Sequence, residues 1–187
     1  MKPIETERLV LRNFRADDAK ALYDYMHKPV AGCFLSEALP DMAAALADVT
    51  KRSTDDGQIA VCLRAGGVMI GDLFAHSERE ETAEWDSVSV GWNFNPAYGG
   101  RGFALEAARA LFAHLFARPG IRRLYAYVEE DNTPSARLCE KLGMRKEGVF
   151  IDFVTFGNDA AGQPVYENTM QYALLRREWD ARTAQKS

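Results

Sequence analysis

Three glycines lie close together just before a stretch of helix-forming residues, at Gly99, Gly100 and Gly102 in the segment NPAYGGRGFALEA. Glycine has no side chain, so a loop of this composition can turn several backbone N–H groups toward one point. The following helix adds the positive end of its dipole, and Arg101 adds a cationic side chain. The pattern predicts a phosphate-binding loop, with a flexible turn as the alternative interpretation.

Two common phosphate-binding motifs do not fit this segment. A Walker A loop needs Gly-Lys-Ser or Gly-Lys-Thr, which occurs nowhere in the sequence. A Rossmann fingerprint needs Gly or Ala where this chain has Leu105, and it follows an early βαβ strand, whereas this loop lies in mid-chain. P-loop nucleotide hydrolysis is therefore excluded, and dinucleotide binding is disfavoured.

The composition is that of one globular domain. The 187 residues are 47% hydrophobic and 27% charged, with a net charge of −4, which is ordinary for a folded domain and unlike a disordered chain. Nucleic-acid binders usually have a basic stripe, so the mild acidity weighs against such a partner. We expect a single domain over residues 1–187.

The cysteines and the N-terminal residues indicate the cellular location and whether a metal site is expected. Cys33, Cys62 and Cys139 are far apart and lack the spacing of a metal site. The first residues have no apolar signal region, and no run approaches the roughly 18 apolar residues of a membrane span. We expect a cytoplasmic protein without a metal, a disulfide framework or a membrane partner.

Hydrophobic periodicity predicts the elements that hold the loop. Strands are expected at residues 8–14, 58–64, 68–75, 84–94, 122–130, 148–156 and 166–175, and helices at 17–26, 41–52, 104–116 and 133–142. Hairpins dominate the first half, which predicts an α/β domain whose mixed, mostly antiparallel sheet has six to seven strands flanked by about four helices. Thr133 is expected to cap the last helix, and the polar tail from about residue 176 is expected to fray.

Six segments, in order along the chain, resemble one family. PAYGGRGFALEA is similar to the acetyl-coenzyme A (acetyl-CoA) loop of GNAT N-acetyltransferases, especially the RimJ/RimL type. The opening IETERLVLRNFRADDAKALYDYM, VMIGDL, VSVGWNFNP, RLYAYVEEDNTPSARLCEKLGMRKEGVF and MQYALLRREW resemble the other segments of that subgroup. The resemblance implies the GNAT fold, in which the sheet splays between its fourth and fifth strands.

The resemblance also implies the cosubstrate and the residues that bind it. Acetyl-CoA would donate its acetyl group directly to a primary amine in a ternary complex. A backbone N–H where the fourth strand splays from the fifth, near Trp92 to Phe94, would polarise the thioester. The glycine loop would hold the pyrophosphate, and an asparagine would bind the pantetheine arm. The donor-binding residues implied are Trp92, Asn93, Phe94, Gly99, Gly100, Arg101, Gly102, Phe103, Ala104, Asn132 and Ser135.

The residues implied for proton transfer match the family pattern only in part. Ser135, in the first turn of its helix, is the implied proton donor to the leaving thiolate, with a plain helix-start residue as the alternative. Cys139 stands where many relatives have a tyrosine, and we interpret it as a core residue. Ser89 stands at the family's glutamate position and cannot act as a base alone. The nearest carboxylates are Glu84 and Asp86, either of which can also be a solvated surface charge; His76 is a third, outside candidate for the base.

The acceptor amine is not readable from these motifs. Trp85, Ser89, Tyr127 and Tyr172 are the predicted lining of its pocket, although aromatic strand residues are more often part of a core. The acceptor is expected to be a protein N-terminus or a small-molecule amine, and the protein a monomer or homodimer. The alternative, favoured by Ser89, is a catalytically silent module of the same fold that only binds acyl-CoA.

Overall fold

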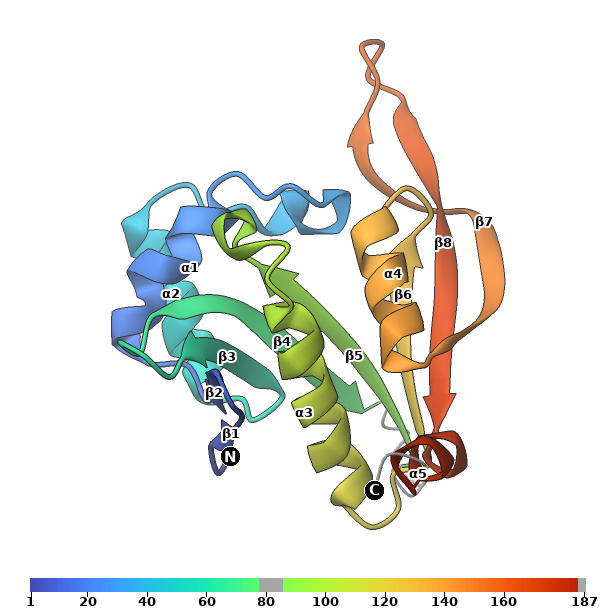
Figure 1. Cartoon of the computed structure of the whole chain (residues 1–187). Coiled ribbons are helices and arrows are strands. Elements are labelled where there is room, and N and C mark those ends of the chain that lie inside the picture. Colours follow the sequence, from blue (N-terminus) through green and yellow to red (C-terminus); the bar gives the residue numbers. More distant parts are fainter. Residues whose placement is uncertain (78–85, 185–187) are drawn as a thin grey trace. The chain divides into compact units, whose positions relative to one another are not determined.

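A computed structural model describes residues 1–77 and 86–184 (Figure 1). Its contacts divide the chain into two compact units, one of residues 1–75 and 91–114 and the other of residues 76–90 and 115–187. The eight strands are hydrogen-bonded in the order β1-β2-β3-β4-β5-β6-β8-β7. Strand β5 (Ser87–Phe94) and helix α3 (Phe103–Ala117) contribute residues to both units.

The first unit is built on an antiparallel meander. Alternating apolar residues place Leu9 and Leu11 in the core, and Leu11 pairs with Val61. Helix α2 begins where the Asp41 carboxylate accepts a hydrogen bond from the Ala44 N–H at 2.8 Å. The elements are β1 (Ile4–Glu5), β2 (Leu9–Arg12), η1 (Ala16–Asp18), α1 (Ala19–Met26), η2 (Gly32–Glu37), α2 (Met42–Ser53), β3 (Gln58–Leu63), β4 (Met69–Ser77) and η3 (Pro96–Tyr98).

A buried polar cluster connects helices α1 and α2 of this unit to β4. Asp72 is 2% exposed, and its carboxylate accepts a hydrogen bond from the Tyr25 hydroxyl at 2.5 Å. Its other oxygen lies 3.3 Å from Nη1 of Arg52 on α2. Burial raises the pKa of the Asp72 carboxyl to about 6, although Arg52 and the Tyr25 hydrogen bond oppose the shift.

The second unit is formed around a long hairpin. Strand β8 lies between β6 and β7 and pairs antiparallel with both. The hairpin of β7 and β8 continues beyond the end of β6, and α4 lies against β6 (Figure 1). The elements are β6 (Arg123–Glu129), α4 (Thr133–Leu142), β7 (Arg145–Asn158), β8 (Pro164–Leu175) and α5 (Arg176–Ala184).

Strands β5 and β6 are parallel and pair over a short distance. Their ladder joins Ser87 to Arg123, Val88 to Leu124 and Ser89 to Tyr125, although β5 continues to Phe94. The other registers that the structure describes are antiparallel. The mixed, mostly antiparallel sheet predicted from sequence is confirmed.

Three details differ from the sequence-based predictions. The sheet has eight strands because the two-residue β1 was too short to produce a pattern. The tail expected to fray instead forms a fifth helix, α5, whose Glu178 accepts the Leu175 N–H at 2.8 Å and pairs with Arg145. The cap of α4 is Asn132 rather than Thr133. Each difference depends on contacts that a local pattern does not contain.

We predict that Asp72→Asn changes how stability depends on pH. The folded pKa of about 6 lies above the ordinary 3.8, so the contribution of Asp72 is fully present below about pH 3.8 and is lost as pH rises through 6. Between pH 4.5 and 7, the free energy of unfolding of the wild type should fall relative to that of the variant by on the order of 2 kcal/mol.

Urea denaturation of both proteins across this pH range measures the difference. Asp24→Asn is the control, since it removes a partly exposed carboxylate that pairs with Lys20 on α1. A wild-type-minus-D72N difference that does not vary with pH would show that Asp72 ionises normally in the folded protein.

Candidate functional site

The glycine loop leaves β5 through a tight turn and enters α3 directly. The Asn95 side chain accepts a hydrogen bond from the Ala97 N–H at 2.9 Å, which starts the short helix η3. Gly100 has φ +71° and Gly102 has φ +79°. Residues with a Cβ atom rarely adopt these left-handed angles, so the two glycines are required by the path of the chain.

This path leaves a run of backbone donors unused. Among the residues that the structure describes, none accepts a hydrogen bond from the N–H groups of Gly100 through Leu105, and the first acceptor is the Gly102 carbonyl, which bonds Glu106 N at 3.1 Å. Helix starts leave several such groups, and the glycine loop adds more. The run is suited to bind an anion with several oxygens, such as a pyrophosphate.

Arg8, the residue just before β2, forms hydrogen bonds that hold this loop. Its guanidinium donates to the Arg101 carbonyl at 3.0 Å and to Glu106 Oε2 at 2.6 Å. Burial opposes ionisation of Glu106, but hydrogen bonds from Thr6 and Arg8 outweigh it, so its pKa is lowered. Neither Arg8 nor Glu106 was predicted from sequence, because their 98-residue separation carries no local signal.

The predicted cationic residue of the loop is exposed. The Arg101 guanidinium lies 4.9 Å from the centroid of the Phe103 ring, and that of Arg8 lies 4.5 Å from it. Phe103 itself is 5% exposed and anchors the first turn of α3. Arg101 is thus a local positive charge beside the unused N–H groups.

The end of β5, predicted to polarise a thioester, is packed tightly against β4. A Cβ atom at Gly71 would lie 2.6 Å from the Asn93 carbonyl oxygen and from the Phe94 ring. The Asn93 amide donates to the Met26 sulfur at 3.0 Å, and Trp92 is half-buried on the same strand. Close packing holds the backbone from Trp92 to Phe94 in a defined position.

In the second unit, Asn132 and Ser135 together form the start of α4. The Asn132 side-chain oxygen accepts a hydrogen bond from the Ser135 N–H at 3.2 Å. Both side chains are half-buried. Ser135 therefore lies in the first turn, where the helix dipole stabilises negative charge. The side-chain oxygen of Asn132 is occupied by the hydrogen bond that caps the helix.

Cys139 lies one turn further along α4 and is fully buried. Burial raises the pKa of its thiol to about 12. A thiol with this pKa is neither a good proton donor nor a nucleophile near neutral pH. The structure agrees with its interpretation as a core residue.

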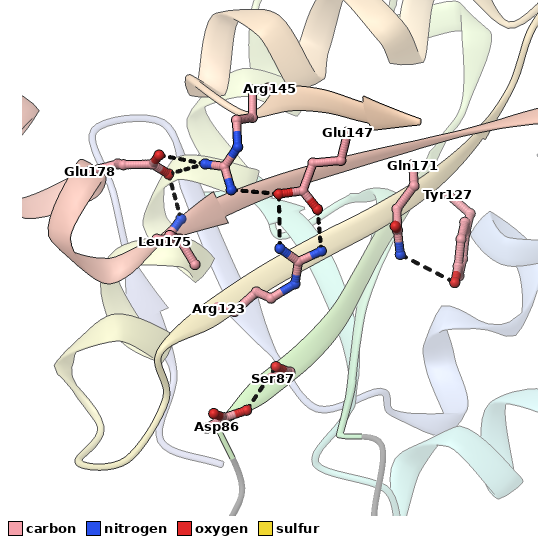
Figure 2. A network of polar contacts seen from close by, with 9 residues as sticks. All are labelled: Asp86, Ser87, Arg123, Tyr127, Arg145, Glu147, Gln171, Leu175 and Glu178. Carbon is pink, nitrogen blue, oxygen red and sulfur yellow. Dashed lines mark hydrogen bonds and ion pairs between the residues drawn. The ribbon is translucent and has the colours of Figure 1, made fainter. Parts of the chain in front are cut away.

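Of the candidate bases, Asp86 and His76 lie in the described part of the chain. Asp86 accepts hydrogen bonds from Arg122 at 2.9 Å and Ser87 at 2.8 Å, which lower its pKa, and Figure 2 shows the contact with Ser87. Glu84 and Trp85 lie outside the described residues. His76 is exposed on β4, and Ser89 is half-buried on β5 beside Tyr125.

The two predicted pocket tyrosines lie on opposite faces of the sheet. Tyr127 of β6 is 44% exposed, and its hydroxyl accepts a hydrogen bond from the Gln171 amide at 3.3 Å (Figure 2). Tyr172 is 4% exposed, and burial, with Glu140 and Cys139 nearby, raises its pKa. The structure therefore does not bring Tyr127 and Tyr172 together.

Within residues 1–77 and 86–184, no group of three or more His, Cys, Asp and Glu side chains could hold a metal ion. No helix in these ranges has the length and apolar character that crossing a membrane requires.

Buried thiols lead to a prediction about chemical labelling. At pH 8 in native buffer, a disulfide reagent should react rapidly with one equivalent of thiol, at the half-buried Cys33. Burial raises the pKa of Cys62 to about 11 and that of Cys139 to about 12, so neither forms much thiolate at this pH. Absorbance of the released thiol gives the count.

In denaturant, all three cysteines should react. Cys33→Ser is the control and should leave the native protein unreactive. Rapid labelling of a second equivalent in the native state would contradict the burial of α4 or β3.

Comparisons with known proteins find a matching family model and similar sequences. The family model described as "Acetyltransferase (GNAT) domain" matches residues 8–145. The uncharacterized N-acetyltransferase YnaD of Bacillus subtilis is 32% identical over 179 residues, covering 95% of this chain and 99% of the relative.

Solved structures extend the similarity to three dimensions. A GNAT-family acetyltransferase from Bacillus anthracis is 29% identical with a TM-score of 0.82, covering 94% of this chain and 99% of that one. RimL, a ribosomal L7/L12 α-N-protein acetyltransferase in complex with coenzyme A, has 17% identity and a TM-score of 0.71, covering 93% and 98%. At this identity RimL supports the fold alone.

Proposed function

Because this chain belongs to the GNAT acetyltransferase family, we propose that it transfers the acetyl group of acetyl-CoA directly to a primary amine. The observation that carries the proposal is the run of unused backbone N–H groups from Gly100 to Leu105. A coenzyme A pyrophosphate supplies oxygens for several of these donors at once. The loop and α3 supply positive potential in an otherwise acidic chain.

The proposed reaction is an acyl transfer in one ternary complex. The neutral amine nitrogen forms a bond to the thioester carbonyl carbon, and the C–S bond then breaks. The amine loses one proton, and the leaving thiolate gains one, so charge and atoms balance. A backbone N–H between Trp92 and Phe94 is the proposed donor to the developing oxyanion, held in place by the packing on Gly71.

Ser135 is the proposed proton donor to the thiolate. Its position in the first turn of α4 favours a neighbouring negative charge. Asn132 is the proposed partner of the pantetheine arm through its amide N–H, since its oxygen caps the helix. Cys139 is too deeply buried and too weakly acidic for this role.

Neither Ser89 nor Asp86 is suited to accept the proton of the amine. Ser89 has no basic group, and Asp86 is paired with Arg122. Glu84 stays a prediction because it lies outside the described residues. Without a side-chain base, the reaction rate follows the fraction of acceptor that is uncharged and rises with pH.

We base the proposed acceptor, location and assembly on sequence resemblance. The RimJ/RimL-like segments favour a protein N-terminal amine, while small-molecule amines are the alternative acceptors. The cytoplasm is the proposed location, and a monomer or homodimer the proposed assembly. Solved relatives below 25% identity support the fold and do not select among acceptors.

Free thiol release from acetyl-CoA, measured with a panel of amines and peptides, tests the proposal. Turnover with at least one acceptor is expected. Coenzyme A binding without turnover of any acceptor would instead support a silent acyl-CoA-binding module.

We predict that Gly102→Val weakens acetyl-CoA binding about a hundredfold, roughly 2.8 kcal/mol. A branched side chain at φ +79° forces the loop to change its path, and its Cβ would lie 3.6 Å from Nη2 of Arg8, which contacts the same loop. Isothermal calorimetry with acetyl-CoA measures the change.

Gly66→Val is the matched control. Gly66 has φ +84° with no atom within 4 Å of a Cβ, so it brings similar backbone strain at the turn between β3 and β4. Both variants should lose similar stability, and only Gly102→Val should lose affinity. Near-normal affinity in Gly102→Val would rule out the loop as the pyrophosphate site.

We predict that Ser135→Ala lowers kcat about 10²-fold while acetyl-CoA affinity stays unchanged, because it removes only the proposed proton donor. Steady-state kinetics and calorimetry separate the two effects. Thr133→Ala removes a hydroxyl from the same helical turn and should leave kcat unchanged. An unaltered kcat in Ser135→Ala would place proton donation elsewhere.

A further inference from the structure

The Glu106 carboxylate is held by the turn that joins β1 to β2, residues 6–8. Its Oε1 accepts hydrogen bonds from the Thr6 hydroxyl at 2.6 Å and from the Arg8 N–H at 2.9 Å. Its Oε2 lies 2.6 Å from both Nε and Nη2 of the Arg8 guanidinium. One turn therefore binds both oxygens of a carboxylate that lies 98 residues further along the chain.

This turn is itself fixed on the sheet of the first unit. The Thr6 N–H donates to the Leu9 carbonyl at 3.0 Å, and the Leu9 N–H donates to the Thr6 hydroxyl oxygen at 2.9 Å. The side chain of Leu9 is buried in the core. The Arg64 N–H donates to the Arg8 carbonyl at 2.9 Å, which ties the turn to the end of β3. The turn thus gives the start of α3 a fixed point of reference.

Arg8 carries this fixed position into the glycine loop. Its Nη1 donates to the Arg101 carbonyl at 3.0 Å, and its guanidinium packs 4.5 Å from the centroid of the Phe103 ring. In a planar trans peptide, the C=O group and the next N–H point in opposite directions. Because Arg8 holds the Arg101 carbonyl, it turns the Gly102 N–H away from itself. Arg8 thereby sets the direction of one of the donors that no described residue accepts from.

The charge of Arg8 alone does not account for this arrangement. Glu106 lies in the first turn of α3, where a carboxylate occupies the positive end of the helix dipole that would otherwise attract an anion. The ion pair of Arg8 with Glu106 leaves no net charge beside the loop. What the pair supplies is therefore a fixed direction for the loop backbone.

We propose that Arg8, oriented by Glu106, is a positioning residue for the pyrophosphate of acetyl-CoA, acting through the Arg101 carbonyl on the Gly102 N–H. The proposal rests on the proposed function, which assigns the glycine loop to the pyrophosphate. It limits the effect of Arg8 to acetyl donors that carry this group. A donor with the same thioester and no phosphate does not use the oriented N–H groups.

Kinetics with two acetyl donors tests the inference. S-acetylpantetheine has the thioester and pantetheine arm of acetyl-CoA without the pyrophosphate and the nucleotide. Arg8→Ala should raise the KM for acetyl-CoA at least about tenfold, with kcat at saturation unchanged. The same variant should leave kcat/KM for S-acetylpantetheine unchanged. An equal loss with both donors would indicate general damage to the fold and would overturn the inference.

Two further variants separate position from charge. Arg8→Lys keeps the charge, but an ammonium lacks the planar fork that binds a carboxylate and a carbonyl together, so KM for acetyl-CoA should rise nearly as much as in Arg8→Ala. Glu106→Gln removes a negative charge from the first turn of α3, so charge alone would tighten the binding of an anion. Loss of positioning instead predicts a KM about fivefold higher.

A KM near the wild-type value in Arg8→Lys, or at or below it in Glu106→Gln, would overturn the inference and leave the proposed function intact. Arg64→Ala is the matched control, since it removes an exposed arginine whose guanidinium donates to the Thr6 carbonyl of the same turn at 2.9 Å. It should leave the KM for acetyl-CoA unchanged.

Calorimetry with coenzyme A decides the inference if no acceptor is acetylated. Weaker binding to Arg8→Ala and to Glu106→Gln than to the wild type and Arg64→Ala supports Arg8 as a positioning residue. Equal binding to all four proteins overturns it. No binding to the wild type would overturn both the inference and the proposed function.

Discussion

The backbone N–H groups from Gly100 to Leu105, for which no described residue is an acceptor, are the feature on which the candidate site of the first unit depends. Leaving such donors without acceptors costs stability unless solvent or a ligand satisfies them. The left-handed angles at Gly100 and Gly102 create the run, and Arg8 holds it open by binding the Arg101 carbonyl and Glu106. An anion that bridges several donors is the natural complement.

The same unit uses buried charge for positioning. Asp72 joins Tyr25 and Arg52, so α1 and α2 are both tied to β4. Strand β4 in turn packs through Gly71 on the end of β5. A chain of close contacts thus runs from the helices to the backbone proposed to polarise the thioester, and the ionisable group in it is fully paired rather than catalytic.

In the second unit, charge is distributed unevenly over one face of the sheet. Arginines pair with Glu147 and Glu178 at one end, while Glu129 and Glu167, at the other, form no ion pair with any described residue. Since carboxylates that lack a cationic partner repel one another, this end of the sheet is the more negative of the two.

Local pattern predicted most of the strands and helices and the glycine turn, because periodicity and turn residues act over a few positions. The family was indicated by resemblance of six segments to known sequences. The polar α5, the Asn132 cap and the Arg8–Glu106 brace required contacts across the fold, which sequence spacing does not encode. Likewise, alternation predicted that Tyr127 and Tyr172 lie on strands, and only strand pairing separated an exposed face from a buried one. The sequence by itself therefore determined the glycine turn before α3, because the required backbone angles are local, while tertiary structure decided which side chains share a surface, because strand pairing joins distant residues.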